Sequence, residues 1–80
     1  MGIEIHDDRL QATDMLGVED AEVLLDWLLN HPDGPVDLGA CDHLHAANLQ
    51  VLMATRPRIS AWPAHPGLAN WLRHALNQEE

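Results

Sequence analysis

The chain has 80 residues, of which 46% are hydrophobic and 21% are charged, a balance typical of one folded domain rather than of a disordered segment. Thirteen acidic residues against four basic ones give a formal net charge of -9, which disfavours binding to nucleic-acid phosphates or to anionic lipid surfaces. We therefore expect a single acidic domain over residues 1–80 whose favoured partners are proteins with basic or mixed surfaces, or else small ligands and cations.

The first part of the chain predicts a β-hairpin followed by a helix. Apolar and polar residues alternate on both sides of His6–Arg9, so residues 2–12 are expected to form two short strands, with residues 13–17 as a connection. From Val18 to Asn30 apolar residues recur at helical spacing, and acidic residues fill the first turn. Prolines and a glycine in residues 31–35 end this helix. Its expected inward residues are Val18, Ala21, Leu24, Leu25 and Leu28.

The second part of the chain predicts strands that alternate with helices. Val36–Cys41 is expected to be a short buried strand, Ala46–Thr55 a helix and Arg58–Trp62 a further strand, with a last helix opening at His65 and Pro66. The order β-β-α-β-α-β-α predicts a small α/β domain with a mixed sheet and helices packed mainly on one face. Residues 77–80 are expected to fray. The expected inward residues of the two helices are Ala46, Leu49, Leu52 and Met53, and Leu68, Trp71, Leu72, Ala75 and Leu76.

Large apolar side chains are few, because Phe and Tyr are absent. Leucines and three tryptophans must therefore supply most of the buried surface. Trp27 and Trp71 are expected in the core. Trp62, beside Pro63 at a strand end, is expected to be partly exposed and available to a partner.

The single cysteine, Cys41, excludes an intramolecular disulfide, and the first ten residues lack the apolar run of a signal peptide. No apolar run approaches the roughly 20 residues that span a bilayer. We expect a reducing cytoplasm as the location and no membrane insertion.

The strongest functional clue lies between Val36 and Met53. The sequence VDLG (Val36–Gly39), followed by HAANL (His45–Leu49), resembles the strand end and the Asp-Ser-Ser-Gly-Leu turn of the STAS domain, which occurs in bacterial anti-sigma factor antagonists and in sulfate transporters. The neighbouring predicted elements also fall where this family has them. The resemblance implies a STAS-like fold and a non-catalytic bacterial protein-interaction module of signalling or regulatory pathways.

The sequence departs from the family at the residues that carry its switch. In antagonists of this family a kinase phosphorylates a serine or threonine in the turn, but the aligned positions are Ala46 and Ala47, which have no hydroxyl. The resemblance therefore implies a docking surface for a kinase, phosphatase, receptor or regulator without the usual switch. Whether Thr13, Thr55 or Ser60 replaces the switch is left open. The expected partner-binding residues are His43, His45, Ala46, Ala47, Asn48 and Gln50.

The segment from Cys41 to His45 leaves a second function open, a small-ligand or metal-binding protein. Cys41, His43 and His45 are possible zinc ligands, although a familiar zinc finger needs two paired clusters. The helix start after His45 could bind an anion, but no glycine-rich loop precedes it. Catalysis by Cys41 would need an orienting residue and an oxyanion device, and neither is recognisable. We therefore expect no enzyme activity and no cofactor, and a homodimer through the wide apolar stripe of the first helix is a third alternative.

Overall fold

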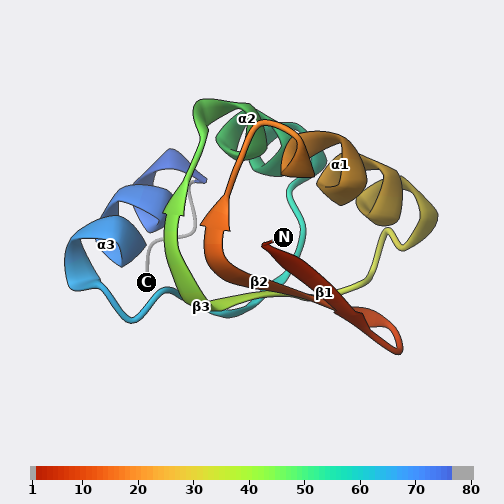
Figure 1. Ribbon diagram of the computed structural model, residues 1–80, viewed down its shortest axis with the longest axis horizontal. Coiled ribbons are helices and arrows are strands. Elements are labelled where there is room, and N and C mark those ends of the chain that lie inside the picture. Colours follow the sequence, from red (N-terminus) through yellow and green to blue (C-terminus); the bar gives the residue numbers. More distant parts are fainter. Residues whose placement is uncertain (1, 77–80) are drawn as a thin grey trace.

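The protein folds into seven elements in the predicted order, β-β-α-β-α-β-α (Figure 1). The strands are β1 (Ile3–His6), β2 (Arg9–Leu16), β3 (Val36–Leu44) and β4 (Ile59–Ala61), and the helices are α1 (Asp20–Asn30), α2 (Ala46–Thr55) and α3 (Pro66–Ala75). The structure, a computed structural model, describes residues 2–76, so the expectation for residues 77–80 lies outside the described residues. Within that range no helix has the length and apolar character needed to cross a membrane.

The four strands form one mixed sheet in the order β1-β2-β3-β4. β1 and β2 pair antiparallel across a tight turn, in which Asp7 takes the left-handed conformation with φ 55°. β2 pairs parallel with β3, and β3 pairs parallel with β4, so α1 and α2 are the crossover helices. These two helices lie side by side, whereas α3 lies on the far side of β3 from β2 (Figure 1). The predicted small α/β domain with one mixed sheet and three helices is confirmed.

Both central strands are longer than the sequence predicted. Residues 13–17 are not a connection, because β2 runs on to Leu16 through Asp14, whose left-handed φ of 56° bends the strand without ending it. β3 likewise continues past Cys41 to Leu44. The register between the two strands shifts twice, since the seven residues from Leu10 to Leu16 pair with the nine residues of β3. Such bulges increase the local bend, which is visible in both strands in Figure 1.

One apolar cluster fills the interior, and its fully buried large side chains come from β2, β3 and all three helices: Leu10, Leu16, Leu24, Val36, Leu38, Leu52 and Leu72. Trp27 belongs to this cluster as predicted, and its indole stacks on His31 with ring centroids 4.5 Å apart. The prediction for Trp71 is wrong, because this side chain is 50% exposed. Trp62 is partly exposed as predicted, and the guanidinium carbon of Arg73 lies 5.2 Å from its ring centroid.

The predicted inward faces of the helices are partly wrong. Val18 is 59% exposed because α1 begins two residues later, at Asp20, and Leu25 is 39% exposed. On α2 the buried residues are Asn48 and Leu52, while Ala46 and Met53 are exposed. Most of the ten residues of α2 are apolar, so the spacing of apolar residues does not select one face.

Candidate docking site at the carboxyl ends of β2 and β3

The candidate site lies where β2 and β3 end together. Leu16 pairs with Leu44 at the last position of the parallel ladder, and the backbone N–H of His45 donates a hydrogen bond to the carbonyl of Leu16 at 2.8 Å. The loop that leads to α1 and the turn that leads to α2 therefore leave the sheet at the same edge. In open α/β sheets the carboxyl edge of the strands is where binding sites commonly form.

The helix α2 is capped at this edge by His45. The backbone of His45 is extended, and its Nδ1 accepts a hydrogen bond from the N–H of Ala47 at 3.0 Å. This bond satisfies one of the N–H groups that the first turn of a helix leaves without a partner. His65 caps α3 in the same way, with its Nδ1 accepting from the N–H of Leu68 at 3.2 Å. His45 thus has a structural role that the sequence analysis missed.

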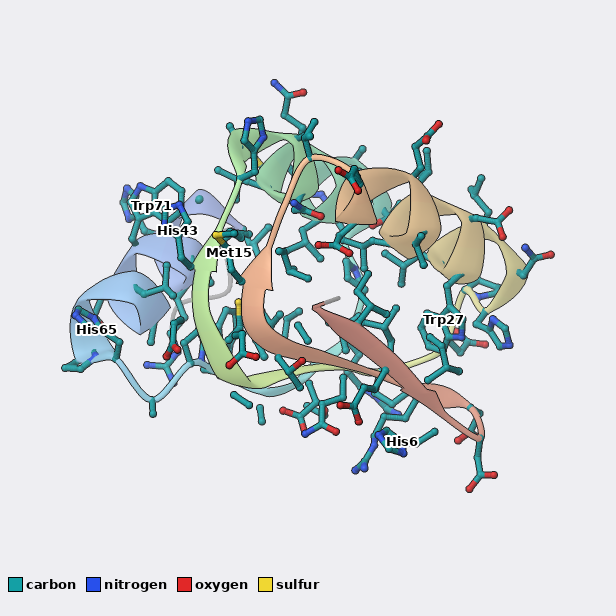
Figure 2. The ribbon with its side chains drawn as sticks, in the orientation of Figure 1. His6, Met15, Trp27, His43, His65 and Trp71 are labelled. Atoms are coloured by element: carbon teal, nitrogen blue, oxygen red, sulfur yellow. The ribbon has the colours of Figure 1, made fainter. Side chains whose placement is uncertain are left out.

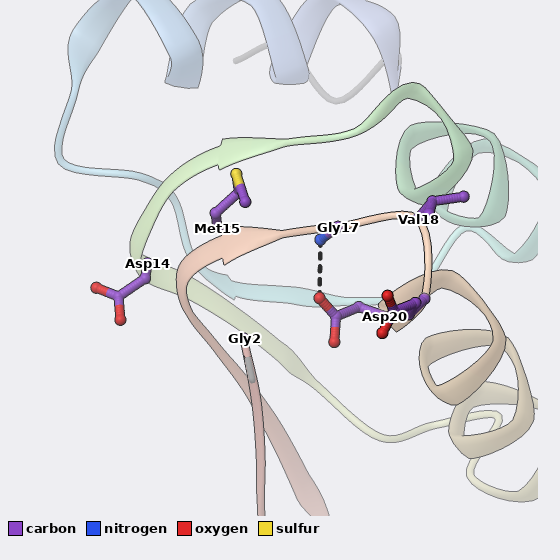
Figure 3. Close-up of a pocket in the computed structure, with 7 residues that line it drawn as sticks. Gly2, Asp14, Met15, Gly17, Val18 and Asp20 are labelled. Atoms are coloured by element: carbon purple, nitrogen blue, oxygen red, sulfur yellow. Dashed lines mark hydrogen bonds between the residues drawn. The ribbon is translucent and has the colours of Figure 1, made fainter.

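Asn48 ties the first turn of α2 to the loop that precedes α1. Its side chain is fully buried, and its Nδ2 donates hydrogen bonds to the carbonyls of Leu16 and Gly17, at 3.1 and 2.8 Å. The N–H of Gly17 in turn donates to Oδ2 of Asp20 at 2.8 Å (Figure 3). Both the N–H and the carbonyl of Gly17 therefore take part in hydrogen bonds. Asn48 therefore has no exposed surface for the predicted contact with a partner.

The other predicted docking residues lie on or next to the first turns of α2. His43, His45, Ala46 and Gln50 are exposed and Ala47 is partly exposed. We call these five residues the α2 surface. Met15, predicted to lie in a connection, pairs with His43 and is 57% exposed, so it extends this surface onto β2. Figure 2 shows Met15 and His43 close together, between the sheet and α3.

Cys41 does not join this surface, because it is 2% exposed and belongs to the core. The second register shift lies between Cys41 and His43, so these side chains do not share a face of the sheet. Burial raises the pKa of the Cys41 thiol above its ordinary value, and the neighbouring carboxylate of Asp42 raises it further. The thiol donates a hydrogen bond to the carbonyl of His43 at 3.3 Å. A neutral, buried thiol is a poor nucleophile and a poor metal ligand.

The three possible zinc ligands of the sequence analysis are not brought together. Cys41 faces the interior, whereas His43 is exposed on β3 and His45 uses its Nδ1 to cap α2. Over residues 2–76, no three side chains among His, Cys, Asp and Glu lie close enough to hold a metal ion.

An acidic hollow of about 610 Å³ opens beside the end of β2 (Figure 3). It is lined by Gly2, Asp14, Met15, Gly17, Val18, Glu19 and Asp20. Asp20 is buried and engaged by Gly17, whereas Asp14 and Glu19 are exposed. Because the charged lining is entirely acidic, the hollow favours a cationic group over an anion. It shares Met15 with the extended α2 surface.

Comparison of the chain with models of protein families, with curated proteins and with solved structures finds no match. The likeness to STAS domains therefore rests on the pattern of Val36–Leu49 and enters below as a proposal.

Proposed function

We propose that this chain is a non-catalytic protein-interaction module of a bacterial signalling or regulatory pathway, STAS-like in type and without the usual phosphorylatable residue. The observation that carries the proposal is the start of α2, which begins at the shared edge of two parallel strands and exposes His43, His45 and Ala46. The order of the elements, which agrees with the order that the resemblance implies, supports it.

The docking partner in this proposal is a kinase, phosphatase, receptor or regulator with a basic or mixed surface. The net charge of -9 favours such a surface and disfavours nucleic acid. The acidic hollow beside Met15 offers a place for a basic side chain of the partner next to the α2 surface. A reducing cytoplasm is the proposed location, and the single, buried cysteine is consistent with it.

Docking in this proposal does not depend on phosphorylation of α2. Ala46 and Ala47, which align with the phosphorylated positions of the family, have no hydroxyl. The hydroxyl of Thr55 donates to the carbonyl of Val51 at 2.7 Å, and that of Ser60 donates to the carbonyl of Val36 at 3.3 Å. These internal bonds favour a structural role for both hydroxyls over a regulatory one. We therefore propose a surface that is always competent to bind.

The test compares two variants that each place an arginine on an exposed helical position. Ala46→Arg puts a bulky cation in the middle of the α2 surface, whereas Asn70→Arg puts it on α3. Each protein and the wild type are used as bait in the native cytoplasm, and bound proteins are identified by mass spectrometry. We expect Ala46→Arg to lose a partner that the wild type and Asn70→Arg both retain. An unchanged set of partners with Ala46→Arg would rule out the α2 surface.

A small-ligand or metal-binding function is the second candidate, and the hollow at the end of β2 is the observation that favours it. The hollow is open at the surface, and its only deeply buried carboxylate, that of Asp20, already accepts a hydrogen bond from Gly17. Its other two carboxylates, those of Asp14 and Glu19, are exposed to solvent. Protein docking is therefore the better supported function.

A further inference from the structure

A second surface with the character of a binding site lies on the outer side of α1. Leu25 and Leu29 are separated by one helical turn and are 39% and 68% exposed. Both line a shallow hollow of about 530 Å³, together with Glu22, Val23 and Asp26. Single exposed leucines are ordinary, but two that share a hollow form a contiguous apolar patch.

The patch continues toward α2. Leu29 also lines a second hollow, of about 270 Å³, where the carboxyl ends of α1 and α2 meet. The other lining residues of this hollow are Leu28, Pro32, Ala54, Thr55 and Pro57, none of which is charged. Leu29 therefore lines both hollows and joins them into one largely apolar stretch of surface.

The charges around the patch are acidic. Glu22 and Asp26 are exposed, lie one helical turn apart and border the same hollow as the leucines. α1 contains no lysine or arginine, and α2 contains no charged residue. Along the chain, the basic residue nearest to either helix is Arg56, which directly follows α2.

This charge pattern argues against a second copy of the chain as the occupant. A symmetric contact through the patch would bring Glu22 and Asp26 of one copy toward the same residues of the other, and each copy carries a net charge of -9. Like charges held at an interface oppose association. The same carboxylates would attract a cationic partner.

We propose that Glu22, Leu25, Asp26 and Leu29 form a docking groove for a positively charged amphipathic helix of a partner protein. The aliphatic stripe of that helix contacts Leu25 and Leu29, and its basic residues pair with Glu22 and Asp26. The groove is separate from the α2 surface, so it does not rest on the function proposed above.

The probe is a fluorescent synthetic helix of about 18 residues, five turns, with leucines on one stripe, arginines on both sides of it and alanines elsewhere. Binding is measured by fluorescence anisotropy. We expect Leu25→Ser with Leu29→Ser to weaken binding by about 10-fold or more, because the two leucines supply the apolar surface that the helix buries. Leu29→Ser alone should weaken it by a smaller factor. The control Ile5→Ser with Trp71→Ser, which changes two exposed apolar residues elsewhere, should leave the affinity unchanged.

A second pair of variants tests the charges. Glu22→Gln with Asp26→Asn should weaken binding and reduce its salt dependence, whereas Asp7→Asn with Asp42→Asn removes the same number of charges at other exposed positions and should do neither. A peptide with glutamate in place of each arginine should not bind.

Three outcomes would overturn the proposal. The first is equal weakening by the two charge variants, which would show general attraction to an acidic protein. The second is binding that the leucine variants leave intact. The third is a dimer in sedimentation that the double leucine variant converts to a monomer, which would assign the groove to a second copy.

Discussion

Asn48 donates a hydrogen bond from its buried side-chain amide to the carbonyl of Gly17 at 2.8 Å, and so joins the first turn of α2 to the loop before α1. The two residues are 31 positions apart in the chain. The shape of the candidate docking site therefore depends on a side chain that is not itself on the surface.

Replacing Asn48 with alanine should destabilise the protein by about 2 to 4 kcal/mol, because the carbonyls of Leu16 and Gly17 would each lose a buried donor. Urea unfolding followed by circular dichroism measures the change. Gln50→Ala on the exposed side of the same helix is the matched control and should shift the free energy of unfolding by no more than about 0.5 kcal/mol. Equal effects of the two substitutions would contradict the role of Asn48.

The Cys41 thiol should react slowly with a thiol reagent near neutral pH in the folded protein, and rapidly once urea unfolds it. Burial raises its pKa in the folded state above the unfolded value of 9.0, so ionisation is easier in the unfolded chain. The raised pKa of Cys41 stabilises the folded state fully below pH 9.0, and this stabilisation is lost as the pH rises through the pKa of the folded state. Wild type should therefore lose more stability than Cys41→Ala between pH 8 and pH 10 in urea titrations. Equal losses of stability in the two proteins over this pH range would contradict the raised pKa of Cys41.

Gly34→Ala should destabilise the protein by about 1 to 3 kcal/mol, because a Cβ at this position would collide with the indole of Trp27. That ring is buried and stacked on His31, so it has little room to move. Gly17→Ala serves as the control, since a Cβ there would meet only Oδ2 of Asp20, at an ordinary 3.7 Å. The midpoint of thermal unfolding should fall clearly for the first variant and little for the second.

His65→Asp should stabilise α3. Aspartate is a strong N-cap acceptor and also carries a negative charge at the positive end of the helix dipole, so a gain of about 0.5 to 1 kcal/mol is expected. His65→Ala removes the bond from the N–H of Leu68 to Nδ1 and should lower stability by a similar amount. Urea unfolding of both variants checks the opposite signs. A loss of stability with aspartate would show that the imidazole has a role beyond capping.

Stoichiometric zinc should leave the imidazole resonances of His43 and His45 in place in an NMR titration. Cys41 is buried in the core, and over residues 2–76 no three potential ligands are close enough to hold the ion. Specific shifts of both histidines at one equivalent of zinc would revive the metal-binding function and weaken the case for protein docking.

The order of the elements could be predicted from the sequence because each helix is bounded by strong local signals. The breakers in residues 31–35 end α1, Pro57 follows α2, and Pro66 is the first residue of α3. The lengths of β2 and β3 could not be predicted. Asp14 and the polar residues Asp42 and His43 look like turn residues, whereas in the fold they continue the strands. The bulges at these positions depend on how β2 and β3 pair, and these strands are distant in the sequence.

The start of α2 could be predicted from the sequence, but the burial of the residues around it could not. The pattern at His45–Leu49 located the start of α2, and four of the six predicted docking residues are exposed there or on the end of β3. Nothing in the local sequence indicates that Asn48 turns inward, because its partners are carbonyls of Leu16 and Gly17 on a distant strand end. Met15 was missed for the corresponding reason, since its exposure next to His43 depends on the register of β2 and β3.

The short strand β4 leaves most of one edge of β3 without a paired strand. β4 pairs only with Val36 and Asp37, so within residues 2–76 the outer edge of β3 from Leu38 onward has no neighbouring strand. α3 lies alongside this edge in Figures 1 and 3, anchored by the buried Leu72. Open strand edges recruit strands from other molecules. With α3 in this position, less of that edge is open to a strand from another molecule, so truncation of the chain before Pro66 should make the protein more prone to self-association.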